Sequence, residues 1–106
     1  MTTDDDIAEF ARMDACEQAE LVRSGQVAPG ELVDAAVAAA ERTNPAINAI
    51  IHPRFEAARA ESITATGPFA GVPIVVKDLG CAIGGEPHHQ GVRALKALDF
   101  RAPHDS

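Results

Sequence analysis

The sequence has no tryptophan and no tyrosine, and its only aromatic residues are four phenylalanines. Hydrophobic residues still make up 46% of the 106 positions and charged residues 24%. Both fractions are ordinary for globular domains, which excludes wholesale disorder and collagen-like or coiled-coil architectures. The length allows one small domain. Alanine fills much of the apolar fraction, so each buried position contributes less than a leucine or phenylalanine would.

Basic residues are scarce, with nine against sixteen acidic ones and a net charge of -7. This is the wrong sign for neutralising phosphates, so neither nucleic acid nor an anionic membrane is an expected partner. No apolar run approaches the roughly 20 residues that span a bilayer. The start, MTTDDDIAEF, is acidic where a signal peptide would be basic. We therefore expect a cytoplasmic protein.

Cysteine is also rare. Cys16 and Cys81 form no CxxC pair, which argues against a disulfide framework or a zinc ribbon and predicts two reduced thiols, Cys81 at least half-buried. The adjacent His88 and His89 could be combined with Cys81 or His104, but the spacing matches no zinc pattern. We expect both histidines to be solvated loop residues, and we expect neither a metal nor an organic cofactor.

Helical patterns dominate residues 1–63. Asp14 followed three positions later by Glu17 predicts a helix start, and Gly25 predicts its end. Two further helices are expected, one from Pro29 and one from about 53 to 62.

The second of these helices is expected to begin at Pro29, because the first turn tolerates a missing N–H. Its apolar stripe has helical spacing and comprises Val33, Ala36, Val37 and Ala40. The pair Asn44 and Pro45 is expected to end it, because a residue before proline is pushed out of the α region.

Two strands are expected, at 47–51 and at 72–76. The second is continuously apolar and rich in β-branched residues, as in a strand covered on both faces of an α/β sheet. A glycine-rich loop follows, and residues 103–106 resemble the approach to a further helix that does not appear, as if the chain stopped in mid-fold. Two strands alone make no stable sheet, so we expect marginal stability and self-association through exposed edges.

Lys77 is the candidate catalytic residue. At the exit of an apolar strand it would be partly removed from water, which lowers the pKa of an amine. A shift from about 10.4 to about 7 or 8 needs roughly 3 to 5 kcal/mol. Asp78 need not pair with it, since adjacent side chains of a strand point to opposite faces. The alternative interpretation is a lysine snorkelling from a strand end, the commoner case for a lone lysine.

The residues around Lys77 resemble a known family. GPFAGVPIVVKDL, preceded by DACEQAELVRSGQVAPGELVDAAVAAAERTNPAINAII, is similar to the N-terminal part of amidase signature hydrolases. HPRFEAARAES is similar to the group of amidases typified by 6-aminohexanoate-cyclic-dimer hydrolase. Amidotransferase A subunits are less similar, because they usually carry KDN where Leu79 stands here.

The resemblance implies an α/β fold: N-terminal helices plus the first strands of the mixed-sheet amidase signature fold, incomplete in this chain. Residues 1–106 would be the N-terminal segment of a single amidase signature domain. Within it, 1–63 would be mainly helical, and 64–106 would hold the lysine-bearing strand and the glycine-rich loop.

The resemblance also gives Lys77 a role, because it matches the family's catalytic lysine. That lysine acts through a serine on a cis peptide bond to deprotonate a nucleophilic serine, which attacks the amide carbonyl. Both serines lie downstream in the family, and Ser24, Ser62 and Ser106 match neither. The expected function is hydrolysis of the C–N bond of a non-peptide linear amide, a small-molecule substrate, with this chain inactive alone.

Two alternatives stay open. One is a non-catalytic α/β interaction module or remnant, and the other is a fragment of an amidotransferase A subunit, which would need partner subunits. A reading frame that continues past Ser106 into a Gly/Ser-rich signature would favour the enzyme, whereas a natural stop codon would favour a remnant.

Overall fold

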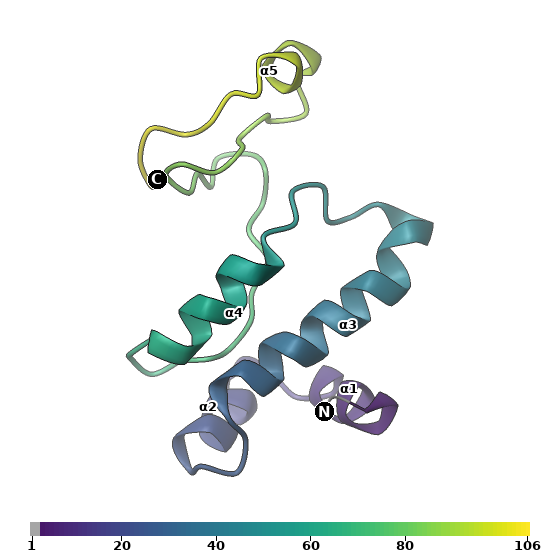
Figure 1. Ribbon diagram of the computed structural model, residues 1–106, viewed down its shortest axis with the longest axis vertical. Coiled ribbons are helices and arrows are strands. Elements are labelled where there is room, and N and C mark those ends of the chain that lie inside the picture. Colours follow the sequence, from purple (N-terminus) through teal and green to yellow (C-terminus); the bar gives the residue numbers. More distant parts are fainter. Residues whose placement is uncertain (1–2) are drawn as a thin grey trace. The chain divides into compact units, whose positions relative to one another are not determined.

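The computed structural model describes residues 3–106, in which five helices and no strand form. The helices are α1 (Asp4–Ala11), α2 (Ala15–Arg23), α3 (Pro29–Ile47), α4 (Phe55–Thr64) and α5 (Arg93–Ala97) (Figure 1). The chain divides into two compact units, Met1–Pro73 and Ile74–Ser106. The N-terminal half is helical as expected, and the first strands of an α/β sheet are not formed.

Helix α1 was not predicted from the sequence. The Thr3 hydroxyl accepts a hydrogen bond from the Asp6 N–H, and the Asp6 carboxylate accepts one from the Thr3 N–H, both at 3.1 Å. This reciprocal capping box satisfies two donors that a helix start leaves unpaired. Asp4 adds an ion pair to Arg42 of α3 at 2.6 Å. The sequence signal for this helix start is Thr3 followed three positions later by the acidic Asp6.

Helix α2 begins and ends where the sequence predicted. The Asp14 carboxylate accepts a hydrogen bond from the Glu17 N–H at 2.8 Å. After the helix, Gly25 takes a positive φ of 78° and its N–H donates to the Val22 carbonyl at 3.1 Å. Ala19 is buried.

Helix α3 begins at Pro29 as predicted but runs through Pro45 to Ile47, so the predicted helix end at 44–45 is wrong. Pro45 removes one helical hydrogen bond, the one that its N–H would donate to the Glu41 carbonyl, and the helix continues for only two residues beyond it. The helix ends at Asn48, whose φ of 48° lies in the left-handed region.

The strand predicted at 47–51 does not form. Ile47 is the last residue of α3, and the backbone of Ile50 is bonded to a side chain instead of a neighbouring strand. The Asn44 amide accepts from the Ile50 N–H at 2.8 Å and donates to the Ile50 carbonyl at 2.9 Å. One side chain therefore satisfies both groups that a strand partner would have bonded.

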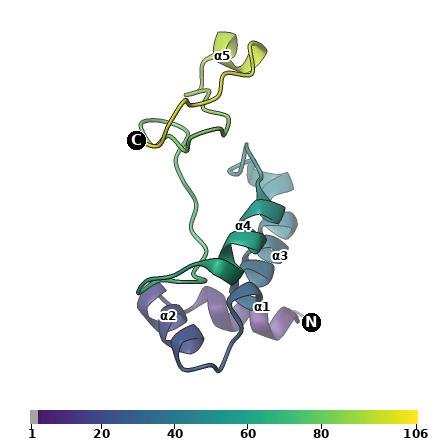
Figure 2. The same cartoon turned by 60° about the vertical axis from the view of Figure 1, so that its left-hand side comes forward.

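The core of the first unit lies around α3, which packs against α1 and α4 (Figures 1 and 2). Of the predicted stripe, Val33 is buried and the other three residues are half-buried. Leu32 and Ala35 are buried as well, because contacts with two helices widen the covered face. A cavity of about 90 Å³ remains beside α1 and α3, and Ala35, Ala36 and Ala39 of α3 are among the residues that line it. Such a cavity is expected in a core that has few large side chains to fill the space between its helices.

Helix α4 confirms the third predicted helix. It is tied to α3 by an ion pair between Arg59 and Asp34, with a distance of 2.8 Å from Nε to Oδ1. The same guanidinium covers Gly30, where an added Cβ would lie 3.2 Å from an Arg59 nitrogen. An alanine at position 30 would therefore need only a small shift of the flexible Arg59 side chain.

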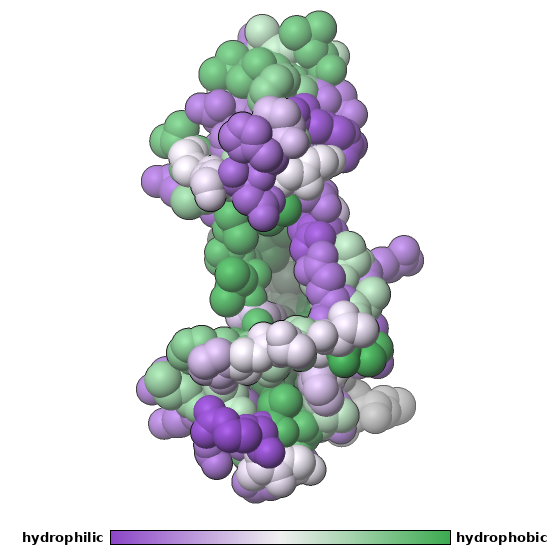
Figure 3. Space-filling view, turned by 90° about the vertical axis from the view of Figure 1, so that its left-hand side faces the viewer, coloured by the Kyte–Doolittle hydropathy of each residue, from purple (hydrophilic) through white to green (hydrophobic). Residues whose placement is uncertain are grey.

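The apolar segment 72–76 is extended but pairs with no other segment among residues 3–106, so the predicted strand is not formed. Ile74 and Val75 expose 79% and 82% of their surface. Figure 3 shows hydrophobic residues, in green, reaching the surface of the face it draws. A strand exists only by bonding to a neighbour, and the described residues offer this segment none.

The second unit is organised by one antiparallel bridge between Pro87 and Arg101. The short helix α5 precedes this return and was not predicted. At the end of the chain, Asp105 accepts a hydrogen bond from the Gly84 N–H at 2.8 Å, and the Ser106 hydroxyl accepts one from the Ala82 N–H at 2.6 Å. These side chains cap a loop.

Among residues 3–106, no helix has the length and apolar character needed to cross a membrane.

Candidate functional site

Lys77 lies in the second unit, directly after the extended apolar segment, and its side chain is exposed. The expectation that it would be partly removed from water is therefore wrong for the chain as it stands. The physical reason is the missing sheet, because an unpaired extended segment cannot shield the residue at its end. Lys77 makes no ion pair within the part of the chain that the structure describes.

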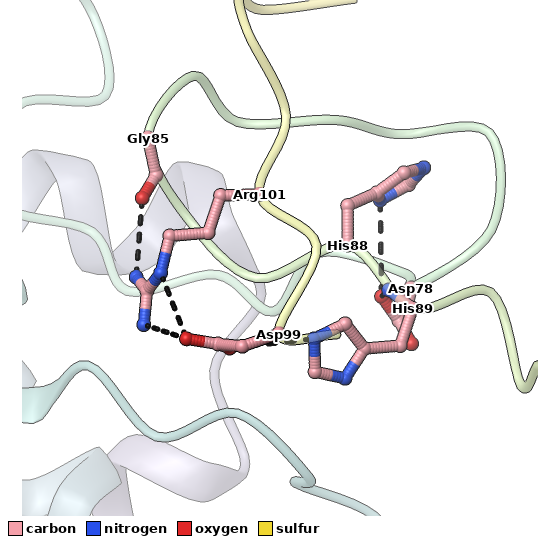
Figure 4. Close-up of polar contacts among 6 residues, drawn as sticks. All are labelled: Asp78, Gly85, His88, His89, Asp99 and Arg101. Carbon is pink, nitrogen blue, oxygen red and sulfur yellow. Dashed lines mark hydrogen bonds and ion pairs between the residues drawn. The ribbon is translucent and has the colours of Figure 1, made fainter. Parts of the chain in front are cut away.

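Asp78, the neighbour of Lys77, is turned toward the returning loop. Its carboxylate accepts a hydrogen bond from the His89 N–H at 3.0 Å, and His88 Nδ1 lies 3.7 Å from the same oxygen (Figure 4). The Asp78 side chain is only 14% exposed. This anchor fixes the backbone beside Lys77 onto the glycine-rich loop, and it directs the carboxylate to His89.

The two histidines are buried, each 9% exposed, so the prediction that they are solvated loop residues is wrong. The bridge at Pro87 draws this stretch against the end of the chain, where the His88 N–H donates to the Phe100 carbonyl at 3.1 Å. His89 Nε2 lies 3.7 Å from Asp99 Oδ1, a separation too long for a good hydrogen bond. Such contacts become ion pairs only when the histidine is protonated.

Arg101 completes this cluster. Its guanidinium lies 3.3 Å from the Asp99 carboxylate and donates to the Gly85 carbonyl at 3.2 Å (Figure 4). The cluster thus links the loop after Lys77 to the returning strand-like segment by side-chain contacts. Its chemistry is structural, because it consists of charges and backbone groups that satisfy one another.

No group of three or more metal-ligating side chains gathers within residues 3–106. Cys16 and Cys81 are both free and exposed, so the expectation of a half-buried Cys81 is wrong.

The serines of the chain are engaged with backbone groups. Ser62 is buried and donates to the Arg59 carbonyl at 2.6 Å. Ser24 donates to the Leu21 carbonyl at 3.3 Å, and Ser106 donates to the Gly80 carbonyl at 3.3 Å. They serve a helix, a helix end and a loop.

One carboxylate has a clearly perturbed proton affinity. Glu61 accepts two hydrogen bonds from the Arg54 guanidinium, at 2.7 and 3.1 Å, and this bonding lowers the pKa of Glu61. Burial acts in the opposite direction, and the charge of Arg54 adds a smaller lowering. The pair links Arg54, the residue directly before α4, to Glu61 within that helix, and it lies outside the candidate site.

Comparison with known proteins gives the family. No family model matches the chain. The chain is 47% identical over 93 residues to the 6-aminohexanoate-cyclic-dimer hydrolases of Pseudomonas sp. (strain NK87) and Paenarthrobacter ureafaciens, covering 88% of this chain and 19% of each relative. It is 35% identical over 102 residues to the A subunit of the glutamyl-tRNA(Gln) amidotransferase of Alkalilimnicola ehrlichii, covering 85% of this chain and 20% of that protein.

The fold agrees with this likeness. A solved structure of 6-aminohexanoate cyclic dimer hydrolase complexed with substrate matches with a TM-score of 0.84 and 47% identity, covering 89% of this chain and 20% of that one. The chain belongs to the amidase signature family and matches the N-terminal part of its members. The resemblance to the 6-aminohexanoate-cyclic-dimer hydrolase group is thereby confirmed. The chain spans about a fifth of the length of these relatives.

Proposed function

We propose that this chain is the N-terminal segment of a single amidase signature domain that hydrolyses a small-molecule, non-peptide amide. Its fold and its 47% identity over 93 residues to two 6-aminohexanoate-cyclic-dimer hydrolases are the observation that carries this proposal. The resemblance in sequence implies a linear amide, whereas the names of these relatives point to a cyclic one. The substrate test must therefore include both kinds.

In the proposed mechanism, Lys77 supplies the catalytic amine. It acts through a cis-serine to take the proton of a nucleophilic serine, which forms an acyl-enzyme that water then hydrolyses. Two features support this role: Lys77 ends the apolar run of the GVPIVVKD element, and the Asp78 carboxylate is turned to the His89 N–H. In this proposal, the apolar surroundings that favour a neutral amine come from the part of the domain that the chain does not contain.

The chain alone is then expected to be inactive, because both serines and the groups that stabilise the developing oxyanion are supplied elsewhere. We place the protein in the cytoplasm, and we expect its unpaired apolar edge to give weak self-association. Purified 106-residue protein should hydrolyse neither the 6-aminohexanoate cyclic dimer nor a linear alkyl amide. Hydrolysis of either one above the buffer rate would contradict the proposal.

The genomic locus gives an independent test. We expect the sequence beyond codon 106 to encode a Gly/Ser-rich signature with two serines, in frame or in a neighbouring gene. A locus without such a sequence would favour the alternative of a non-catalytic remnant.

A second candidate function is that of a segment of an amidotransferase A subunit, favoured by the 35% identity over 102 residues to the protein from Alkalilimnicola ehrlichii. Leu79 argues against it, since such subunits usually carry asparagine after the Lys-Asp pair. Neighbouring genes for the partner subunits would support this candidate.

A further inference from the structure

Asp78 binds the backbone of His89, a residue 11 positions later in the sequence. Its Oδ1 accepts a hydrogen bond from the His89 N–H at 3.0 Å, and His88 Nδ1 lies 3.7 Å from the same oxygen (Figure 4). The Asp78 side chain is 14% exposed, and both histidines are buried. All of these groups lie within the unit Ile74–Ser106. Hydrogen bonds to a carboxylate are among the stronger ones in proteins, so this contact is a firm tie within that unit.

The backbone that Asp78 binds is itself fixed. The His88 N–H donates to the Phe100 carbonyl at 3.1 Å, and the His89 carbonyl accepts from the Val92 N–H at 2.8 Å. The peptide groups before His88, between the histidines and after His89 are therefore all hydrogen-bonded. Asp78 is thus tied to a part of the loop that has little freedom to move.

Lys77 shares a peptide group with Asp78. The chain turns at 78–80, directly after Lys77, and Gly80 takes a positive φ of 78°. A lysine amine sits on a flexible four-carbon stem, and a base must lie within hydrogen-bond reach of the proton it takes. A misplacement of about 1 Å can cost about 10²-fold in rate. The position of the peptide group between 77 and 78 therefore matters for a catalytic lysine.

We propose that Asp78 is a positioning residue for Lys77. Its carboxylate holds the peptide group between the two residues against the His89 N–H, so that the lysine amine is directed at the hydroxyl it deprotonates. This inference rests on the proposed function, because it requires Lys77 to be the catalytic amine. Asp78 contacts no substrate and transfers no proton in this proposal. Its contribution is an acceptor oxygen at a fixed place, which does not require a charge.

Asp105 makes a comparable contact in the same unit, since its carboxylate accepts from the Gly84 N–H at 2.8 Å. Asp105 is not adjacent to Lys77 in the sequence. If Asp78 served only to keep the unit folded, loss of either carboxylate would have a similar effect on turnover. The positioning role predicts that only the loss at position 78 lowers kcat.

The first experiment measures amide hydrogen exchange in the 106-residue chain by NMR. Asp78→Ala should speed exchange of the His89 amide at least about tenfold, because the N–H loses its acceptor. Asp78→Asn should keep this amide protected, since the side-chain carbonyl of asparagine still accepts. The His88 amide, which is bonded to the Phe100 carbonyl, is the internal control and should keep its exchange rate in both variants.

The second experiment measures turnover in a hybrid hydrolase. In this hybrid, the 106-residue chain replaces the matched N-terminal segment of the Paenarthrobacter ureafaciens 6-aminohexanoate-cyclic-dimer hydrolase, and the cyclic dimer is the substrate. Asp78→Ala should lower kcat about tenfold or more and leave KM within about twofold, because the amine is misplaced while substrate binding is untouched. Asp78→Asn should restore at least about half of the native kcat, because it keeps the acceptor. Asp105→Ala should leave kcat unchanged.

Three results would each overturn the proposal. The first is an Asp78→Ala hybrid that turns over as fast as the unmodified one. The second is an Asp78→Asn hybrid as slow as Asp78→Ala, which would assign the effect to the charge. The third is an equal loss of kcat in Asp105→Ala, which would assign it to folding of the unit.

Failure of the proposed function is distinguishable through Lys77→Met in the same hybrid. Full turnover of Lys77→Met would contradict the catalytic role of the lysine, whatever the Asp78 variants do. Loss of turnover in Lys77→Met but not in Asp78→Ala would contradict the positioning role alone.

Discussion

The side-chain amide of Asn44 bonds both backbone groups of Ile50, accepting from the N–H at 2.8 Å and donating to the carbonyl at 2.9 Å. This pair of hydrogen bonds joins the first residue of the stretch Asn-Pro-Ala-Ile-Asn-Ala to the residue directly after it. It turns the chain after α3 and explains why the residues that follow form no strand. The asparagine is therefore a structural residue, because its amide is engaged on both sides.

Asn44→Ala should destabilise the first unit by about 1 to 3 kcal/mol, since Ile50 loses both partners. Asn44→Asp should also destabilise it, because a carboxylate accepts from the N–H but cannot donate to the carbonyl. Urea denaturation followed by circular dichroism measures both effects. Asn48→Gly is the control, expected to be nearly neutral because Asn48 needs only its positive φ of 48°. Equal stability of Asn44→Ala and the native chain would refute this account.

Gly71 should tolerate alanine less well than Gly25. Both have similar positive φ values, 84° and 78°, so the intrinsic backbone cost of alanine is similar, about 1 to 2 kcal/mol. Of the two, only Gly71 has a neighbour in the way, with Pro29 atoms at 3.2 Å from the added Cβ. The thermal midpoint of Gly71→Ala should therefore fall below that of Gly25→Ala. If the two midpoints coincide, the contact with Pro29 does not limit this position.

The pair Arg54 and Glu61 should make stability depend on pH in the acid range. The pKa of Glu61 is lowered in the folded chain relative to its ordinary value of 4.5, so the contribution of the pair is present above that value and is lost as the pH falls through the folded pKa. The effect is small because the pair is exposed. Glu61→Gln should therefore destabilise the chain more at about pH 6 than at about pH 3, whereas Glu56→Gln serves as the control on the same helix. A Glu61→Gln effect that does not change between these pH values would contradict the assignment.

Self-association of the free chain should depend on the extended apolar segment. Sedimentation velocity at rising concentration should show weak association of the native chain, because unpaired edges pair with one another. Val75→Asp should reduce it, and Leu98→Asp, with similar exposure, should reduce it less. Association that is unaffected by Val75→Asp would place the contact elsewhere.

Much of the helical unit could be predicted because its signals are local. Asp14 and Glu17 mark the start of α2, and Pro29 marks the start of α3, with no information from distant residues. The rule that a residue before proline leaves the α region failed at Pro45, where α3 tolerates the loss of one N–H donor and ends two residues later.

The second unit could not be predicted in the same way, because its order comes from contacts distant in sequence. His88 and His89 are buried by a return of the chain at Arg101, which no spacing rule shows. For Lys77, the motif indicates the residue but not its surroundings. A β-strand needs a neighbouring strand to bond to, and a lysine amine removed from water needs apolar residues around it. Residues 3–106 supply neither for this segment, which is why Lys77 is exposed here.

The most direct measurement compares the chain's only two lysines, Lys77 and Lys96. This chain replaces the matched N-terminal segment of the Paenarthrobacter ureafaciens 6-aminohexanoate-cyclic-dimer hydrolase, and the hybrid protein is assayed for amide hydrolysis with Lys77→Met or Lys96→Met. The account predicts that Lys77→Met lowers kcat by about 10²-fold or more, as expected for loss of a proton-transfer group, while the circular dichroism of the hybrid is unchanged. Lys96→Met should retain full turnover. Equal turnover of the Lys77→Met hybrid and the unmodified hybrid would contradict the central claim.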